Sequence, residues 1–209
     1  MTVQILGIHF FKGKMEDIFG SLKNNGGLLT VPAAPALVTI SDDKDYYNAL
    51  LESDIVIPDS GYMVLIWNGF FKNKINKISG LEFINFFIES IDLFKEDSFL
   101  LVNPSDVDGK INKDFLNAKG LDIKDEDGYT APFYNGNVND RRLLDLIEKQ
   151  KPKWILINIG GGTQEKLGLY LKNNLSYSPA ILCTGAALAF KTGRQVNMPG
   201  WVDYIYMGW

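Results

Sequence analysis

The stretch LINIGGGTQEKLGLYL, from Leu156 to Leu171, decides the fold class. It begins inside the run KWILINI, which is apolar on both faces, as is typical of a central strand in a parallel sheet. Gly160, Gly161 and Gly162 follow, and the residues after them have the spacing of a helix. The stretch therefore predicts a buried strand, a glycine turn and a helix in succession.

The same alternation of apolar runs and helix-period segments continues along the chain. It predicts an α/β fold with a mainly parallel sheet, flanking helices and two Rossmann-like halves. A polar, Asp-rich stretch at 103–127 is interpreted as a loop region and as the best candidate for a lobe boundary. Strands are expected at 2–8, 54–59, 98–102, 153–159 and 179–185, a short apolar run at 28–31, and helices at 14–25, 42–53, 80–94, 139–150, 164–175 and 185–193.

Composition excludes several classes of protein. The chain has 209 residues, 46% of them apolar, which is enough for a core. The net charge of −4 gives no basic footprint for nucleic acid. The single cysteine, Cys183, excludes an internal disulfide and a cysteine-based zinc cluster. The N-terminus lacks the order of a signal peptide, and no apolar run is long enough to span a membrane.

Asp59 is the first candidate for chemistry. Sites in parallel sheets lie beyond the carboxyl ends of the strands, and Asp59 ends the apolar run DIVIPD. A carboxylate at that place could take a proton from an attacking hydroxyl. It could equally be a turn or helix-capping residue, because aspartate is common in both.

Two further junctions combine small residues with a following helix. Gly160 to Gly162 would let an anion approach the N–H groups of a helix N-terminus, or would form a tight, closely packed turn. The pattern is neither GxGxxG nor GxxxxGK[ST], which disfavours a nucleotide-dependent oxidoreductase and a P-loop. The segment from Thr184 to Ala187 would line the same cleft or simply pack closely.

The remaining chemical signals are weaker. His9 is the only histidine, so a histidine triad or multi-histidine metal site has little material. The pairs Asp106 with Asp108 and Asp125 with Asp127 are similar to a metal-binding DxD, but a solvated loop is favoured. The C-terminal MPGWVDYIYMGW, residues 198–209, has aromatic residues that suit an interface, including a membrane interface, or a docked terminal segment.

In their order and spacing these segments resemble the WecG/TagA/CpsF family of bacterial glycosyltransferases, glycosyltransferase family 26. The likeness extends from about residue 5 to the last residue and implies a single domain over 1–209. It is carried by PDS at 58–60, KISG at 77–80, GGGTQEK at 160–166, TGAALAFKTG at 184–193 and PGWVDYIYMGW at 199–209.

The resemblance implies a function that residue patterns alone do not give. Such enzymes move a sugar, often an N-acetylhexosamine, from a nucleoside diphosphate such as UDP to a polyprenyl-diphosphate-linked acceptor in cell-wall or exopolysaccharide synthesis. It implies a cytoplasmic enzyme, peripheral on the inner face of the membrane, that needs no metal or other cofactor. Membrane contact is expected through the C-terminal region or a tail beyond it, and a homo-oligomer is compatible with the family.

The resemblance also assigns roles to residues. Asp59 would be the general base, and Gln164 would read the nucleotide base within a loop that holds the diphosphate. Lys77 would face the cleft, and Tyr129 would lie near the nucleotide. The expected substrate-binding set is Lys77, Tyr129, Gly160, Gly161, Gly162, Thr163, Gln164, Glu165, Thr184, Gly185, Ala186 and Ala187.

Two departures from the family pattern support an alternative. Pro32 to Pro35 replaces a polar T-x-N-P segment, which removes groups that could contact sugar or acceptor. Members also usually continue past the tryptophan segment, whereas this sequence ends at Trp209. The alternative is a nucleotide-sugar-binding or assembly protein of the same fold with weak or absent catalysis.

Overall fold

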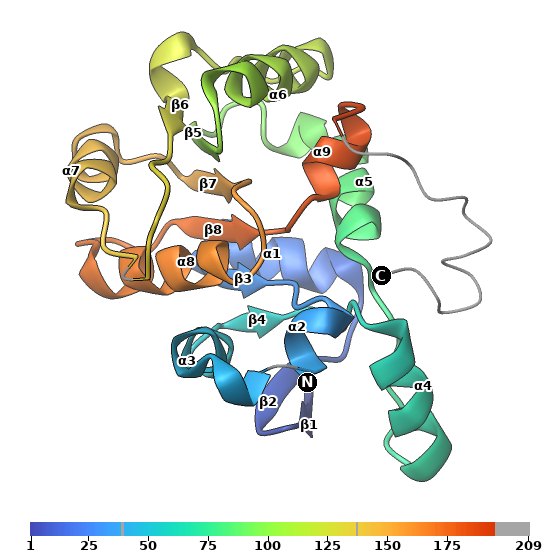
Figure 1. The fold of residues 1–209 in the computed structure, drawn as a ribbon. Coiled ribbons are helices and arrows are strands. Elements are labelled where there is room, and N and C mark those ends of the chain that lie inside the picture. The colour runs from blue at the N-terminus through green and yellow to red at the C-terminus, as the bar shows by residue number, and fades with distance from the viewer. Residues whose placement is uncertain (39, 137, 195–209) are drawn as a thin grey trace.

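The structure is a computed structural model that describes residues 1–38, 40–136 and 138–194. In this part of the chain eight strands form one sheet in the order β1-β2-β4-β3-β8-β7-β5-β6, with helices on both faces (Figure 1). The described ladder is parallel from β2 to β6, and β1 pairs antiparallel with β2 at one edge. The predicted α/β fold with a mainly parallel sheet is confirmed, while the two Rossmann-like halves and the lobe boundary stay predictions.

The bounds of the elements are as follows. The strands are β1 Thr2–Ile5, β2 Ile8–Phe11, β3 Gly27–Thr30, β4 Ile55–Val56, β5 Phe99–Asn103, β6 Gly128–Thr130, β7 Trp154–Ile157 and β8 Ala180–Cys183. The α-helices are α1 Met15–Asn25, α2 Ala34–Val38, α3 Lys44–Leu51, α4 Gly61–Phe70, α5 Gly80–Glu89, α6 Asp106–Ala118, α7 Arg141–Gln150, α8 Thr163–Asn174 and α9 Ala187–Lys191. The short 3₁₀ turns are η1 Ile40–Asp42, η2 Ile91–Leu93 and η3 Asp125–Asp127.

The central strands are buried on both faces because side chains alternate across the sheet. In β3, Leu29 belongs to the apolar cluster that includes residues of α1 and α5. Its neighbour Leu28 belongs to the cluster on the other face, with residues of α7 and α8. For this reason the run KWILINI needs no polar face. The sheet forms the middle of three layers, with helices packed on each of its two faces.

Stacked aromatic rings fill the layer between α5 and the sheet. Phe19 of α1 stacks on Phe83 of α5 with ring centroids 4.7 Å apart. Phe87 and Trp154 lie 6.3 Å apart, and both are fully buried. Each buried aromatic side chain stabilises the fold by about 1.5–3 kcal/mol, so this cluster fixes how α5 sits on the sheet.

Three sequence predictions need correction. The single strand expected at 2–8 is a hairpin, in which β1 and β2 pair Thr2 with Phe11 and Ile5 with Ile8. The polar stretch read as loop holds the 13-residue helix α6, which Ser105 caps at its N-terminus. The helix expected at 139–150 begins at Arg141, and the Asp140 carboxylate caps it by accepting from the Leu143 amide.

Helix α4 was not expected from the sequence. Ser60 caps it, and only Gly61 and Val64 among its residues are buried. Figure 1 shows that it extends away from the sheet, on the side where β1 and β2 form the edge. Within the described ranges, no helix is both long and apolar enough to cross a membrane.

Gly168 shows where a glycine serves close packing. A Cβ placed on Gly168 of α8 would lie 2.6 Å from Leu28 Cδ1 and 3.0 Å from Cys183 Sγ. Both of those residues are completely buried, so neither side chain has free space into which to move. Helix α8 therefore approaches β3 and β8 only because this position lacks a side chain.

Gly168→Ala should lower the free energy of unfolding by about 1–3 kcal/mol, because the added methyl group overpacks this contact. Gly20→Ala is the matched control: Gly20 is also helical, but an added Cβ meets nothing within 4 Å among the described residues. That control should be neutral or stabilise by up to about 1 kcal/mol. Urea denaturation measures the free energy of unfolding of both variants. Equal values for Gly168→Ala and Gly20→Ala would contradict the packing argument.

Candidate functional site

Three strand ends meet at Gly80, the first residue of α5. The Gly80 amide donates to Asp59 Oδ1, which follows β4, at 3.0 Å. A Cβ on Gly80 would lie 3.2 Å from the carbonyl oxygen of Thr184, which follows β8, and 3.4 Å from Val31 Cγ1, which follows β3. The structure thus brings Asp59 and Thr184 to one place at the carboxyl edge of the sheet.

Asp59 lies between the N-termini of two helices. Ser60, its neighbour, caps α4 by accepting from the Met63 amide at 3.2 Å. Ser79 caps α5, and the Glu82 side chain accepts from the Ser79 amide in return. Helix N-termini carry partial positive charge, so both helices stabilise negative charge near Asp59.

The glycine loop between β7 and α8 faces open space. A Cβ added to Gly160, Gly161 or Gly162 would meet no described atom within 4 Å. Close packing therefore does not account for these glycines. Gly160 and Gly162 have φ of +106° and +84°, a backbone conformation that favours glycine. The loop combines a turn that needs glycine with a surface that a ligand could approach.

Gln164 and Glu165 lie beneath this loop, and both side chains are buried. Glu165 Oε2 accepts from the Gly162 amide at 2.6 Å. Its other oxygen accepts from Gln164 Nε2 at 3.0 Å. The Glu165 carboxyl group thus caps α8 and holds the glycine loop. Gln164 points to this carboxyl group, so a role in reading a base stays a prediction.

Burial raises the pKa of Glu165 to about 7, against the smaller lowering by its hydrogen bonds and by Lys166. Burial, followed by the negative charge of Glu165, raises the pKa of Tyr46 of α3 and of Cys183 of β8. Gln164 Oε1 is buried without a hydrogen-bond partner among the described residues. A proton on Glu165 would give this oxygen a donor if the amide turned over.

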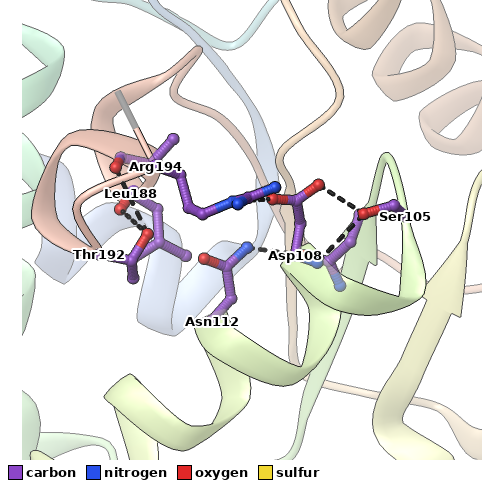
Figure 2. A network of polar contacts seen from close by, with 8 residues as sticks. Ser105, Asp108, Asn112, Leu188, Thr192 and Arg194 are labelled. Atoms are coloured by element: carbon purple, nitrogen blue, oxygen red, sulfur yellow. Dashed lines mark hydrogen bonds and ion pairs between the residues drawn. The ribbon is translucent and has the colours of Figure 1, made fainter. Parts of the chain in front are cut away.

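A cavity of about 260 Å³ lies beside the loop. Its wall includes Gly160 from one predicted junction and Gly185 and Ala186 from another, with Asp108 of α6 and Arg194 after α9 opposite. Arg194 Nε donates to Asp108 Oδ1 at 2.7 Å, and Figure 2 shows this pair spanning from one element to the other. The two junctions therefore line one cavity, and the positively charged guanidinium group of Arg194 lies in its wall.

Polar residues that the sequence patterns did not indicate support this cavity. Ser105 donates to Asp108, and this hydrogen bond, followed by Arg194, lowers the pKa of Asp108. Asn112 Nδ2 donates to the buried Asn103 Oδ1 at 2.8 Å (the side chain of Asn112 appears in Figure 2). Asn158, which follows β7, lines the cavity. The position of these two polar residues at the carboxyl ends of apolar runs was the available signal, since Asn103 ends β5 and Asn158 follows β7.

Tyr129 lies far from Asp59, although β6 is the direct neighbour of β5 and only two strand positions from β7. It lies on β6, five strand positions from β4, which is about 24 Å at the usual strand spacing. Its hydroxyl donates to Asp140 Oδ2 at 2.8 Å, and burial raises its pKa. Tyr129 lines a separate cavity of about 430 Å³ with Lys110 and Lys113 of α6.

The other predicted residues lie near the junctions. Lys77 is half-buried on the turn before α5, Thr163 begins α8, and Ala187 begins α9, where it lies 3.8 Å from a Cβ placed on Gly80. Asp106 and Asp108 lie in the first turn of α6, not in a loop. The C-terminal segment at 198–209 lies outside the described residues.

Comparison with known families settles what kind of protein has this site. The sequence profile described as the glycosyl transferase WecG/TagA/CpsF family matches residues 3–209, nearly the whole chain. The chain belongs to the WecG/TagA/CpsF family. It is therefore a glycosyltransferase, as the resemblance of its motifs predicted. A comparison with individual curated proteins gives no match.

In a WecG/TagA/CpsF glycosyltransferase, Asp59 and the cavity beside Gly160 are the features to compare with what sugar transfer requires. A transferase needs a group to activate the acceptor and a surface to hold a nucleotide-sugar donor. Among the described residues, Asp59 at the Gly80 junction and the cavity beside Gly160 are candidates for these two roles.

The pKa of Glu165 gives a stability prediction. Because the folded pKa is raised from 4.5 to about 7, the stabilising effect of its proton is complete below pH 4.5 and is lost as pH rises towards 7 and above. Glu165→Gln cannot ionise. Relative to wild type, the variant should gain about 2–3 kcal/mol between pH 5 and pH 8. Urea unfolding across that range measures this, and parallel stability curves would contradict it.

Proposed function

We propose that this glycosyltransferase moves a sugar, an N-acetylhexosamine or related hexose, from a UDP-sugar donor to a polyprenyl-diphosphate-linked acceptor. The observation that carries the assignment of the site is the hydrogen bond between Asp59 Oδ1 and the Gly80 amide, at the point where the ends of β3, β4 and β8 meet. Family membership supports a nucleotide-sugar donor and an acceptor. The sugar, nucleotide and acceptor are part of the proposal.

Asp59 is the general base of the proposed reaction. Its Oδ1 is oriented by the Gly80 amide, so one carboxylate oxygen is fixed while the carboxyl group stays half-buried at the edge of the sheet. It takes the proton of the acceptor hydroxyl as that oxygen attacks the anomeric carbon. The bond from that carbon to the diphosphate then breaks, and the diphosphate leaves with the electron pair.

The leaving diphosphate is assigned to the cavity side of the glycine loop. Glu165 already occupies the Gly162 amide, so the inner side of the α8 N-terminus is satisfied by the protein's own carboxyl group. On the outer side, a Cβ added to Gly160 or Gly161 would meet no atom of the described residues within 4 Å. Arg194 across the cavity provides positive charge and further N–H donors for phosphate oxygens.

The proposed acceptor also places the enzyme in the cell. A polyprenyl-linked acceptor is part of a membrane, so the enzyme would act peripherally at the cytoplasmic face of the cell membrane, in the synthesis of a cell-surface polysaccharide such as exopolysaccharide. No resident metal or other cofactor is assigned to the reaction.

Asp59→Asn should lower the transfer rate about 10²- to 10⁴-fold, the usual contribution of a general base, while donor affinity changes little. Asparagine keeps an oxygen that can accept from Gly80, so the junction is preserved. The control Asp92→Asn changes an exposed carboxylate on η2. Transfer is measured with a radiolabelled UDP-N-acetylhexosamine and a lipid-linked acceptor. Equal rates for wild type and Asp59→Asn would remove the base assignment.

Arg194→Ala should weaken UDP binding about tenfold or more, because a charged hydrogen-bond donor to the diphosphate is lost. Lys191→Ala is the matched control: it removes the same charge from the end of α9 and does not line the cavity. Isothermal titration calorimetry with UDP separates the two variants. Equal affinities would assign the diphosphate to another place.

A further inference from the structure

Helix α4 has an apolar stripe on its solvent side. Its exposed residues recur at the spacing of one helix face, i, i+3, i+4, i+7 and i+8, starting from Tyr62. The exposed fractions are 65% for Tyr62, 55% for Leu65, 42% for Ile66 and 82% for Phe70. In an ordinary surface helix this face would be polar, so the stripe needs a physical explanation.

The opposite side of α4 is anchored to the protein, so the stripe does not result from a poorly packed helix. Val64 is buried in the apolar cluster around β1, β2 and α3, and Met63 and Trp67 pack against it. Asn68 accepts from the Ile75 amide at 2.9 Å and donates to the Ile75 carbonyl at 2.8 Å. The helix and the turn after it are thus held by one side while the other side stays apolar and exposed.

The turn after α4 adds positive charge beside the stripe. The sequence from residue 60 to residue 81 contains three lysines and no aspartate or glutamate, although the whole chain has a net charge of −4. Lys72 and Lys74 are exposed on this turn, directly after the exposed Phe71. Lys12 of the neighbouring segment donates to Asn73 Oδ1 at 2.6 Å, which brings a further cation to the turn.

We propose that this α4 face, defined as Tyr62, Leu65, Ile66, Phe70 and Phe71 with Lys72 and Lys74, docks the enzyme on an anionic membrane surface. Aromatic and aliphatic side chains enter the boundary between headgroups and acyl chains, and lysines beside them bind anionic lipid headgroups. In a two-fold symmetric dimer this face would meet itself and bring the lysines of both copies together, whereas anionic lipid headgroups pair with them, so the charges favour a membrane as the occupant.

The α4 face deepens the proposed function and depends on it for its relation to catalysis. Helix α4 begins two residues after Asp59 and is about 15 Å long for its ten residues. The docked face therefore lies within about that distance of the candidate base. A lipid-linked acceptor would reach Asp59 from the same membrane that α4 contacts.

The experiment is co-sedimentation of the full chain with vesicles of phosphatidylcholine alone and of phosphatidylcholine mixed with phosphatidylglycerol. We expect binding to the mixed vesicles that weakens with salt. Leu65→Ser with Phe70→Ser should reduce this binding at least about tenfold, and so should Lys72→Glu with Lys74→Glu. Circular dichroism and thermal unfolding check that the variants fold.

Matched controls change the same residue types on other faces. Val107→Ser with Phe133→Ser replaces two exposed apolar residues, and Lys119→Glu with Lys149→Glu reverses two exposed lysines. These controls should bind mixed vesicles within about twofold of wild type. Control variants that lose binding as strongly as the α4 variants would overturn the proposal.

Two other outcomes overturn the proposal. One is equal binding of wild type and α4 variants to mixed vesicles, or equal binding to both kinds of vesicle. The other is a dimer in light scattering that becomes monomeric in Leu65→Ser with Phe70→Ser without any effect on vesicle binding, which would assign the face to a second copy. UDP calorimetry without vesicles tests the proposed function separately, because the α4 face does not line the cavity.

Discussion

The parallel ladder from β2 to β6 is the constraint on which the remaining structure depends. Because these strands share one direction, every connection between them must cross a face of the sheet. The carboxyl ends of β4, β3, β8, β7 and β5 therefore lie along one edge. Helices α5 and α8 then direct their N-termini to that edge. The Gly80 contact with Asp59 and the cavity beside Gly160 both result from this arrangement.

Features encoded within short windows could be predicted from the sequence. The buried strands β7 and β8 and the helices α1, α5 and α8 have periodic patterns long enough to identify, and their existence is confirmed. Helix α6 was missed because its charged, Asn-rich sequence was interpreted as loop, although Ser105 is a good cap. Helix α4 was missed because it is apolar around most of its circumference, so it has little periodicity.

The candidate site was predictable to a similar extent. Asp59 and Thr184 meet at one junction, as expected of residues after strands. Tyr129 does not join them, because the strand order places β6 at the far edge, and strand order depends on packing that no local pattern records. Arg194 was missed for a related reason: its partner Asp108 is 86 residues away in the sequence. Glycines 160 to 162 left two interpretations open, and the described part of the chain places no atom within 4 Å of a Cβ added there, so close packing against it does not explain them.

The Glu165 carboxyl group that holds the Gly162 amide has a consequence for ligand affinity. A loop with several glycines is entropically costly to order, and a ligand that orders it loses part of its binding free energy in doing so. Here an internal group orders the loop during folding. The free energy of protein folding, and not that of ligand association, therefore carries this entropic term, so a ligand that contacts the loop loses little binding free energy in ordering it.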